Sequence, residues 1–273
     1  MVIPMDFADR YGPWAVITGA SEGTGRAFAR KIAARGVPSV LIARRDAPLK
    51  ALADEIRAES GLACVTASAD LAAPDAFENI AAAVGDREVG LFVNNAGGDP
   101  NGAHFLDREI EAWRRLVRIN VFTMMQCCHH FGGPMRARRK GGILLVNSGA
   151  CYGGGSFLAT YSGSKAFMLC FSEGIWAELR PYGVDVLTLV LGMTDTPAFR
   201  ALLAEKGLPP PPGLASPDEV AEKGLARLPH GPVHNWGQED DVAGYAPNAP
   251  DDRRQRILAI EAASKSVFGE RAL

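Results

Sequence analysis

The sequence lacks the features that mark membrane proteins, secreted proteins and nucleic-acid-binding proteins. None of its apolar runs reaches the roughly 18 residues that a membrane-spanning helix needs. The start, MVIPMDFADRYGPW, has no basic region followed by a long apolar core, so we expect no signal peptide. The formal net charge is only −2, which gives no reason to expect nucleic acid or an anionic membrane as a partner. We therefore expect a cytoplasmic protein.

Cysteine and histidine are few, and neither has the spacing of a metal site. The five cysteines form an odd set without C-x-x-C spacing, so we expect small buried thiols in a reducing compartment. The five histidines show no ligand spacing, because the adjacent His129 and His130 would lie on different faces of a helix. The sequence thus predicts neither disulfides nor a bound metal.

What the sequence does contain is an ordinary globular composition in which two hydrophobic patterns alternate. The 273 residues are 47% hydrophobic and 22% charged, which is enough material for a large core. Short apolar runs predict buried strands at Trp14–Thr18, Val37–Ala43, Leu62–Ala69, Val89–Val93, Ile143–Val146, Val184–Val190 and Val233–Trp236. Helical patterns lie between them, at Asp46–Ser60, Ala73–Val84, Leu106–Phe131, Ala159–Arg180, Pro197–Gly207 and Ser216–Leu228. The alternation predicts an α/β fold, a doubly wound Rossmann-type domain with a mostly parallel sheet and helices on both faces.

We expect a single domain over residues 1–273. Residues 194–232, approximately, are expected to form a substrate lid and the last strand. The four prolines Pro209–Pro212 cannot lie inside a helix and would form a semi-rigid edge to this lid. Residues 238–273 are expected to be a C-terminal extension with a helix at Asp251–Phe268.

A glycine-rich turn follows the first predicted strand directly. Its sequence, GASEGTG at Gly19–Gly25, precedes a segment with apolar residues at helical spacing. Glycines allow a tight turn and close approach of the backbone to a pyrophosphate, which the N-terminus of a helix attracts. The spacing is G-x-x-x-G-x-G rather than G-x-G-x-x-G, and an ordinary glycine turn is the alternative interpretation.

Two arginines end the second predicted strand. Arg44 lies 19 residues after Gly25, about where an acidic residue holds the adenosine ribose in NAD sites. The guanidinium groups of Arg44 and Arg45 would instead pair with a 2′-phosphate, which favours NADP(H) over NAD(H). Two alternatives stay open: a solvated basic pair at a strand end, and Asp46 as a ligand of the ribose.

The stretch from residue 148 to residue 165 contains the residues best suited to chemistry. Tyr161 and Lys165 are one helical turn apart and can share a helix face. A nearby ammonium stabilises the phenolate of a tyrosine, whose ordinary pKa is about 10. Ser148 follows the predicted strand Ile143–Val146, at the sheet edge where open α/β folds bind ligands. By itself Y-x-x-x-K is common by chance, and Asn120 by itself would be interpreted as a satisfied core amide.

Taken together, these segments resemble the short-chain dehydrogenase/reductase family over roughly Tyr11–Thr196. Five signals occur in the family's order: TGASEGTG at Thr18–Gly25, Asp70, NNAG at Asn94–Gly97, Asn120, and Ser148 with Tyr161-x-x-x-Lys165. The opening YGPWAVITGASEGTGRAFA further resembles the branch that contains 17β-hydroxysteroid dehydrogenases and long-chain 3-oxoacyl reductases. Two departures are Leu191-Gly192, where the family often has Pro-Gly, and Thr24, where a branched apolar residue is usual.

The resemblance implies a role for each matching residue. Tyr161 would be the general acid or base, and Lys165 would lower its pKa and hold the nicotinamide ribose. Ser148 would bind the substrate carbonyl, and Asn120 would anchor a water that connects Lys165 to solvent. The implied cofactor contacts are Thr18, Gly19, Ser21, Gly23, Thr24, Gly25, Arg44, Arg45, Asp70, Leu71, Asn94, Ala96, Gly97, Tyr161, Lys165, Gly192, Thr194 and Thr196.

The activity implied by the resemblance is an NADP(H)-dependent interconversion of a ketone and a secondary alcohol. The expected substrate is apolar, of the hydroxysteroid or 3-oxoacyl type, and the expected assembly is a homodimer or homotetramer. One alternative is a protein that senses NADP(H) without turnover, although a sensor does not need Asn120, Ser148, Tyr161 and Lys165 together. Another is an NAD-dependent dehydrogenase of a small aromatic or sugar alcohol.

Overall fold

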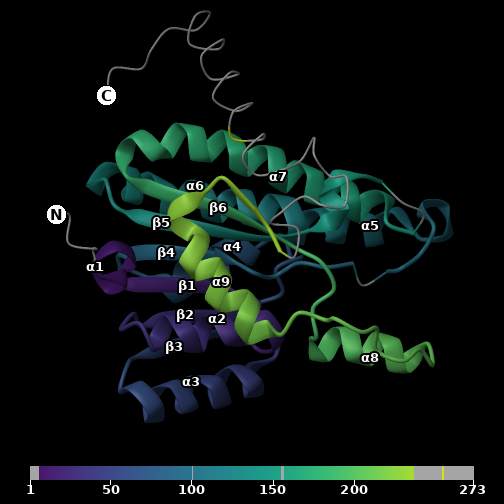
Figure 1. The fold of residues 1–273 in the computed structure, drawn as a ribbon, viewed down its shortest axis with the longest axis horizontal. Helices are drawn as coiled ribbons and strands as arrows, with labels where there is room; N and C mark the ends of the chain where they lie inside the picture. The colour runs from purple at the N-terminus through teal and green to yellow at the C-terminus, as the bar shows by residue number, and fades with distance from the viewer. Residues whose placement is uncertain (1–5, 100, 155–156, 237–253, 255–273) are drawn as a thin grey trace, which may run out of the picture.

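The fold is built on one seven-stranded sheet. The computed structural model describes residues 6–99, 101–154, 157–236 and 254. Its strand order is β3-β2-β1-β4-β5-β6-β7, and all neighbouring pairs are parallel (Figure 1). The strands are β1 Trp14–Thr18, β2 Ser39–Ala43, β3 Cys64–Ser68, β4 Val89–Asn94, β5 Gly141–Ser148, β6 Val184–Leu191 and β7 Val233–Asn235. This confirms the predicted fold class.

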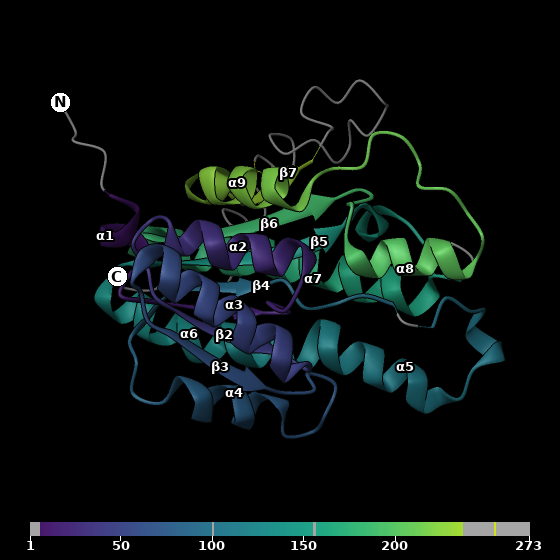
Figure 2. The same ribbon diagram turned by 90° about the horizontal axis from the view of Figure 1, so that it is seen from below.

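Helices cover both faces of the sheet (Figure 2). The α-helices are α1 Phe7–Tyr11, α2 Gly23–Ala33, α3 Asp46–Ser60, α4 Ala76–Val84, α5 Ile110–Val117, α6 Thr123–Arg138, α7 Ala159–Leu179, α8 Pro197–Glu205 and α9 Pro217–Arg227. Short 3₁₀ segments are η1 Phe105–Asp107, η3 Gly149–Tyr152, η4 Arg180–Tyr182 and η5 Leu228–His230, and η2 Arg118–Phe122 is a π-helical turn. Helices α2, α3 and α9 pack on one face, and α4, α6 and α7 pack on the other.

The strands bury side chains on both faces because helices lie above and below them. Along β1, Ile17 belongs to the core under α2, α3 and α9, whereas the adjacent Val16 belongs to the core under α4, α6 and α7. Both side chains are fully buried. Continuous apolar runs are the sequence signature of such doubly covered parallel strands, which explains why the strands were recognisable.

Local signals set several helix boundaries as expected. Helix α9 begins after Ser216, whose hydroxyl accepts a hydrogen bond of 3.2 Å from the Glu219 backbone, while the Glu219 carboxylate accepts one from the Ser216 backbone. Pro217 occupies the first helical position, where no donor is needed. At the other end of a helix, Gly61 stops α3 in the left-handed conformation with φ of 72°.

The predicted continuous helix over Leu106–Phe131 is wrong in its form. The chain first makes η1, then α5, then the π-helical turn η2, and α6 continues seven residues further, to Arg138. A helical periodicity cannot reveal a π-turn, which adds one residue to a turn without changing the apolar pattern nearby. The sequence also did not predict α1. The strand predicted at Val233–Trp236 is present as β7, just beyond residue 232, the approximate end of the segment expected to contain it. The expected C-terminal extension, apart from Arg254, lies outside the described residues.

The strand order locates the point at which a ligand can enter. From β1 the chain moves outward to β2 and β3, and it then returns to the opposite side of β1 to form β4. Loops at the carboxyl ends of β1 and β4 therefore diverge and leave a crevice between them. No helix within the described part of the chain is both long enough and apolar enough to cross a membrane.

Candidate active site

The glycine turn packs tightly against the segment that follows β4. A Cβ at Gly25 would lie 2.1 Å from the carbonyl oxygen of Gly19, and a Cβ at Gly19 would lie 2.9 Å from Ala96 Cα. The Asn95 amide also donates a 3.1 Å hydrogen bond to the Gly19 carbonyl. Gly19 has φ of 67°, so it needs glycine for its conformation as well as for space. The N-terminus of α2 thereby faces the crevice, where it can attract a phosphate group.

Two buried polar residues join the ends of β1 and β4. The Thr18 hydroxyl donates to Asn94 Oδ1 over 3.2 Å, and it accepts a bond of the same length from the Ala96 backbone. Thr24 and Leu71, also expected near the cofactor, are buried. The structure therefore brings the predicted residues of the TGASEGTG and NNAG segments together at one edge.

Lys165 enters the site from α7 and is almost completely buried, with 3% of the residue exposed. Its ammonium donates to the Val146 carbonyl over 3.2 Å and lies 5.8 Å from the centre of the Tyr161 ring. The Asn147 amide fixes the same turn of α7 by donating to the Lys165 carbonyl over 3.1 Å. Burial lowers the pKa of Lys165 to about 8. This cation can therefore change its charge close to neutral pH.

Asn120 lies in the π-helical turn and has no exposed surface. Its amide exchanges two hydrogen bonds of 3.3 Å with the backbone N–H and carbonyl of Gly98. A Cβ at the neighbouring Gly97 would lie 2.6 Å from Asn120 Oδ1 and 3.3 Å from Lys165 Nζ. Asn120 and Lys165 thus flank one glycine of the NNAG segment, which places them close together.

Tyr161 and Ser148 complete the group of four predicted catalytic residues. Ser148 is the last residue of β5, and Tyr161 lies in the first turn of α7, half-buried. Burial raises the pKa of the Tyr161 phenol above its ordinary value, and a hydrogen bond with the Ser148 side chain opposes this rise. Electrostatic interactions with Asp99 and Cys151 add smaller upward contributions to this pKa. In this structure Tyr161 is therefore protonated at neutral pH, which differs from the expected lowering of its pKa by Lys165.

The predicted residues for the adenosine end follow β2 and β3. Arg44 and Arg45 are both exposed, and Arg45 forms an ion pair of 2.6 Å with Glu22 of the glycine turn. Arg45 also lies 3.5 Å from the Ser21 hydroxyl. Asp70 accepts a 2.7 Å bond from Arg115 of α5, which lowers the pKa of its carboxyl. Its other oxygen accepts from the Ala72 backbone over 3.1 Å.

The loop after β6 closes the other end of the crevice. A Cβ added at Gly23 would lie 3.0 Å from the γ-methyl of Thr196, so this loop contacts the glycine turn. The Thr196 hydroxyl accepts a 3.2 Å bond from the Phe199 backbone and caps α8, whereas Gly192 has open space around it. Among the described residues, buried Thr194 Oγ1 and Asn94 Nδ2 lack hydrogen-bond partners. Such unpaired buried groups fit a site built to hold a polar ligand.

Sequence reasoning missed three residues that hold this site together. Asn147 fixes α7, Arg115 pairs with Asp70, and Glu22 pairs with Arg45. Glu22 is the one with a visible signal, because it is an acidic residue inside a turn expected to bind phosphates. Asn147 and Arg115 lie 18 and 45 residues from their partners, Lys165 and Asp70. Helices or strands separate each pair in the chain, so no local spacing reveals these contacts.

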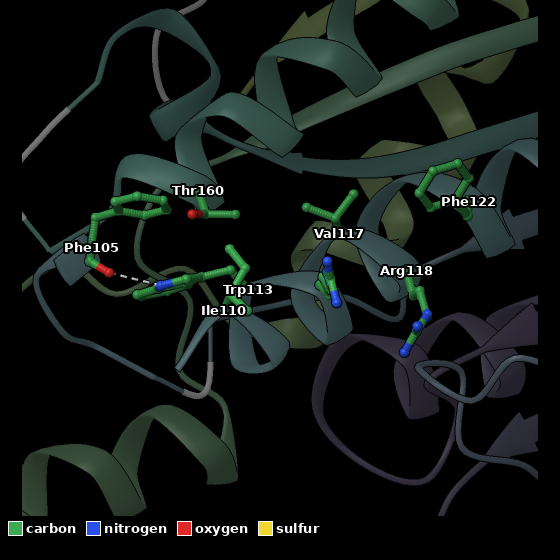
Figure 3. Close-up of a pocket in the computed structure, with 8 residues that line it drawn as sticks. Phe105, Ile110, Trp113, Val117, Arg118, Phe122 and Thr160 are labelled. Carbon is green, nitrogen blue, oxygen red and sulfur yellow. Dashed lines mark hydrogen bonds between the residues drawn. The ribbon is translucent and has the colours of Figure 1, made fainter. Parts of the chain in front are cut away.

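A separate surface pocket of about 360 Å³ lies between α5 and the start of α7 (Figure 3). It is lined mainly by apolar side chains: Phe105, Ile110, Trp113, Val117 and Phe122, with Arg114, Arg118 and Thr160. The Trp113 indole donates to the Phe105 carbonyl over 2.9 Å.

Within the described ranges, no group of three His, Cys, Asp or Glu residues could hold a metal ion.

Comparison with known proteins agrees with this arrangement. Residues 13–207 match the model of the short chain dehydrogenase family. A 7β-hydroxysteroid dehydrogenase of Collinsella aerofaciens is 33% identical over 195 residues, which are 71% of this chain and 74% of that protein. A very-long-chain 3-oxoacyl-CoA reductase of Podospora anserina is 36% identical over 68% of this chain and 56% of its own length.

Solved structures give the same result. The fold is similar to a 7β-hydroxysteroid dehydrogenase structure with a TM-score of 0.82 and 29% identity, over 93% of this chain and 99% of the other. It is also similar to a short-chain dehydrogenase from Sphingobium yanoikuyae in complex with NADPH, with a TM-score of 0.75 and 25% identity, over 96% and 97% of the two chains. The chain therefore belongs to the short-chain dehydrogenase/reductase family and is an oxidoreductase that acts on CH–OH groups.

Proposed function

We propose that the protein interconverts a ketone and a secondary alcohol with NADP(H), using Tyr161, Lys165, Ser148 and Asn120. The observation that carries this proposal is the convergence of these four side chains on the carboxyl edge of the sheet, beside the glycine turn. A bound nicotinamide would supply the hydride to the substrate carbon, or accept it in the reverse direction. The protein's own groups position the substrate and move the proton.

Tyr161 is suited to be the general acid when a ketone is reduced. Its raised pKa keeps the phenol protonated at neutral pH, so it can donate a proton to the carbonyl oxygen as negative charge develops there. The Ser148 hydroxyl, at the end of β5, would donate a hydrogen bond to the same oxygen and stabilise that charge. In alcohol oxidation the same pair would act in reverse.

Lys165 is suited to assist this proton transfer. Its pKa of about 8 means that most molecules hold it as a buried ammonium at pH 7, beside the Tyr161 ring. That positive charge favours the phenolate left after proton donation. Lys165 would also hold the nicotinamide ribose, and Asn120, next to it, would anchor a water that returns the proton from solvent.

The crevice is suited to a dinucleotide. Thr18, the glycine turn and the α2 N-terminus would hold the pyrophosphate, with Asn94, Ala96 and Gly97 beside the adenosine ribose. Thr194, Thr196 and Gly192 would meet the carboxamide and phosphates. Arg44 and Arg45 would hold the 2′-phosphate and give preference for NADP(H) over NAD(H). The similar Sphingobium structure contains NADPH, which supports this assignment.

The substrate is proposed to be apolar and bulky, of the hydroxysteroid or 3-oxoacyl type. Within a single domain, the part of residues 194–232 around α8 would form its lid, while α9 of the same segment packs on the sheet. Three apolar side chains from the segments that follow β5 and β6 are well exposed: Phe157 by 49% and Met193 by 58% in loops, and Leu202 by 45% in α8. Exposed apolar groups near a polar catalytic edge can cover an apolar ligand. Similar proteins include a 7β-hydroxysteroid dehydrogenase and a very-long-chain 3-oxoacyl-CoA reductase, which supports testing both classes.

The test is to bind and then turn over the proposed ligands. Nicotinamide fluorescence would follow titration of the pure protein with NADPH and with NADH, and NADPH oxidation would follow addition of keto-steroids and 3-oxoacyl thioesters. We expect tighter binding of NADPH and turnover of at least one of these two classes. Binding without turnover of any ketone would support a sensor, and binding of neither dinucleotide would overturn the proposal.

We further propose that the apolar pocket of Figure 3 packs against a second copy of the chain. Ile110 and Phe122 are 55% and 52% exposed there, and Glu111 neutralises the nearby Arg118 by an ion pair of 2.9 Å. The mass of the protein in solution should correspond to two or four chains. Ile110→Glu should yield monomers, whereas Leu208→Glu, at an equally exposed position after α8, should not. A monomeric wild-type protein would contradict this part.

A further inference from the structure

The ion pair between Arg45 and Glu22 lies where the proposed 2′-phosphate would bind. Glu22 belongs to the glycine turn after β1, and Arg45 follows β2, the parallel neighbour of β1. Arg45 Nη2 lies 2.6 Å from Glu22 Oε2 and 3.5 Å from the Ser21 hydroxyl. Glu22 is the residue before α2, yet its side chain makes no capping bond to that helix. Its carboxylate contacts the arginine instead.

Other carboxylates near these arginines are already paired with different cations. Asp46, the first residue of α3, forms an ion pair of 2.6 Å with Lys50 one helical turn later. Asp70 pairs with Arg115. Arg44 forms no ion pair within the described residues, although it interacts electrostatically with the Asp70 carboxylate. Among the ion pairs of the described residues, Glu22 is the carboxylate in direct contact with an arginine of this site. The direct contact with Glu22 thus offsets one of the two positive charges that the site presents to a phosphate.

We propose that Glu22 is a specificity-determining residue, because it competes with the 2′-phosphate for Arg45 and so reduces the preference for NADPH over NADH. This inference rests on the proposed NADP(H) site. A phosphate that binds Arg45 must share the guanidinium with a carboxylate, and the two anions repel each other at close range. NADH carries no 2′-phosphate, so its affinity does not depend on this competition.

The solvent exposure of the Arg45–Glu22 ion pair limits how much Glu22 can change the affinity for NADPH. The side chains of Arg45 and Glu22 are 55% and 37% exposed, so solvent and salt screen the repulsion. We therefore expect Glu22→Gln to tighten NADPH binding by about three- to tenfold at low salt. The gain should shrink as salt is added, and the affinity for NADH should change by less than about twofold.

The experiment measures dissociation constants for both dinucleotides, without substrate, for the wild type, Glu22→Gln and Glu59→Gln. Glu59 is a matched control because it also forms an exposed ion pair between α3 and α2, 3.0 Å from Arg30. Glu59→Gln should leave both dissociation constants unchanged. A double variant, Glu22→Gln with Arg45→Ala, should lose most of the gain in NADPH affinity, since the freed arginine is then absent.

The outcomes separate this inference from the proposed function. Unchanged or weaker NADPH binding by Glu22→Gln would overturn it, and weaker binding would mean that Glu22 orients Arg45 for the phosphate. An equal gain for NADH would also overturn it, because the carboxylate would then act on the pyrophosphate. If the wild type bound neither dinucleotide, the proposed function itself would fail.

Discussion

Two parts of the ligand-binding edge differ sharply in how they are held. The catalytic part, with Asn120 and Lys165, is buried, and backbone groups of β5 and of Gly98, just after the NNAG segment, hold it in place. Helix α8, in the proposed lid, contains no buried residue. The exposed fraction of Lys165 is 3%, against 58% for Met193 in the loop that leads to α8.

The buried catalytic part and the exposed lid allow different inferences about function. Buried polar groups must satisfy hydrogen bonds with defined partners, so their positions and their chemistry are tightly specified. Exposed apolar residues on a lid are free to vary as long as they cover some apolar ligand. The reaction class is thus readable from the catalytic part, whereas the substrate depends on the lid and needs direct measurement.

Tyr161→Phe should lower kcat by about 10²- to 10⁴-fold, because it removes the proposed proton donor and leaves the ring in place. Steady-state kinetics with NADPH and a ketone substrate would measure the loss. The affinity for NADPH should stay within several-fold of the wild type. Tyr182→Phe is the control, since it removes a hydroxyl from η4, which directly precedes the amino end of β6. A Tyr161→Phe variant with wild-type kcat would refute the proposed mechanism.

Lys165→Met should raise the free energy of unfolding at pH 7 by about 1–3 kcal/mol while it destroys activity. The pKa of this lysine falls from its ordinary 10.5 to about 8 because charging it in the core is costly. Below pH 8 both the folded and the unfolded chain hold the ammonium, so the full cost opposes folding. Replacement by an apolar side chain removes that cost.

The burial of Lys165 also makes the free energy of unfolding depend on pH. Between pH 8 and 10.5 the unfolded chain binds more protons at Lys165 than the folded chain, so the contribution of this residue to stability rises with pH. Urea unfolding at pH 7 and pH 10 should show this rise in the wild type relative to Lys165→Met. A destabilised Lys165→Met variant would mean that the bond to the Val146 carbonyl outweighs the cost of burial.

The same division between buried and exposed parts explains how much the sequence predicted. The bounds of β1 and α3 match their predicted ranges, because apolar runs and capping residues are local signals. All four proposed catalytic residues lie at one edge, as the family resemblance implied. The π-helical turn at Asn120 was missed, because it leaves no mark on apolar spacing.

Long-range polar pairs were also beyond sequence reasoning. Arg10 and Tyr11 of α1 both donate to Asp185 at the start of β6, with Tyr11 Oη 2.7 Å from the carboxylate. The partners are separated by about 175 residues, so neither their spacing nor their type indicates the contact. The Arg45–Glu22 pair also joins segments that are not adjacent in the chain, so the sequence shows both residues in motifs but not their contact.

The rate of ketone reduction should fall above about pH 8, by at most tenfold per pH unit. Lys165 loses its charge there, and the phenolate left by Tyr161 then loses its nearby cation. Measuring kcat from pH 6 to pH 10 with saturating NADPH would show the decline, with circular dichroism as the check that the fold persists. A constant kcat up to pH 10 would exclude the Lys165 charge from the rate-limiting step.

The smallest expected effect concerns the lid, and a pair of matched leucines tests it. Leu202→Ala, in exposed α8, should change the free energy of unfolding by less than about 0.5 kcal/mol and raise the KM of a bulky apolar ketone by about three- to tenfold. Leu225→Ala, at a buried position in α9, should cost about 2–5 kcal/mol and leave that KM unchanged. Calorimetry and kinetics on both variants would measure the contrast. If Leu202→Ala left KM unchanged for every bulky ketone, α8 would have no part in covering the substrate, and the apolar wall would have to come from the loop after β5.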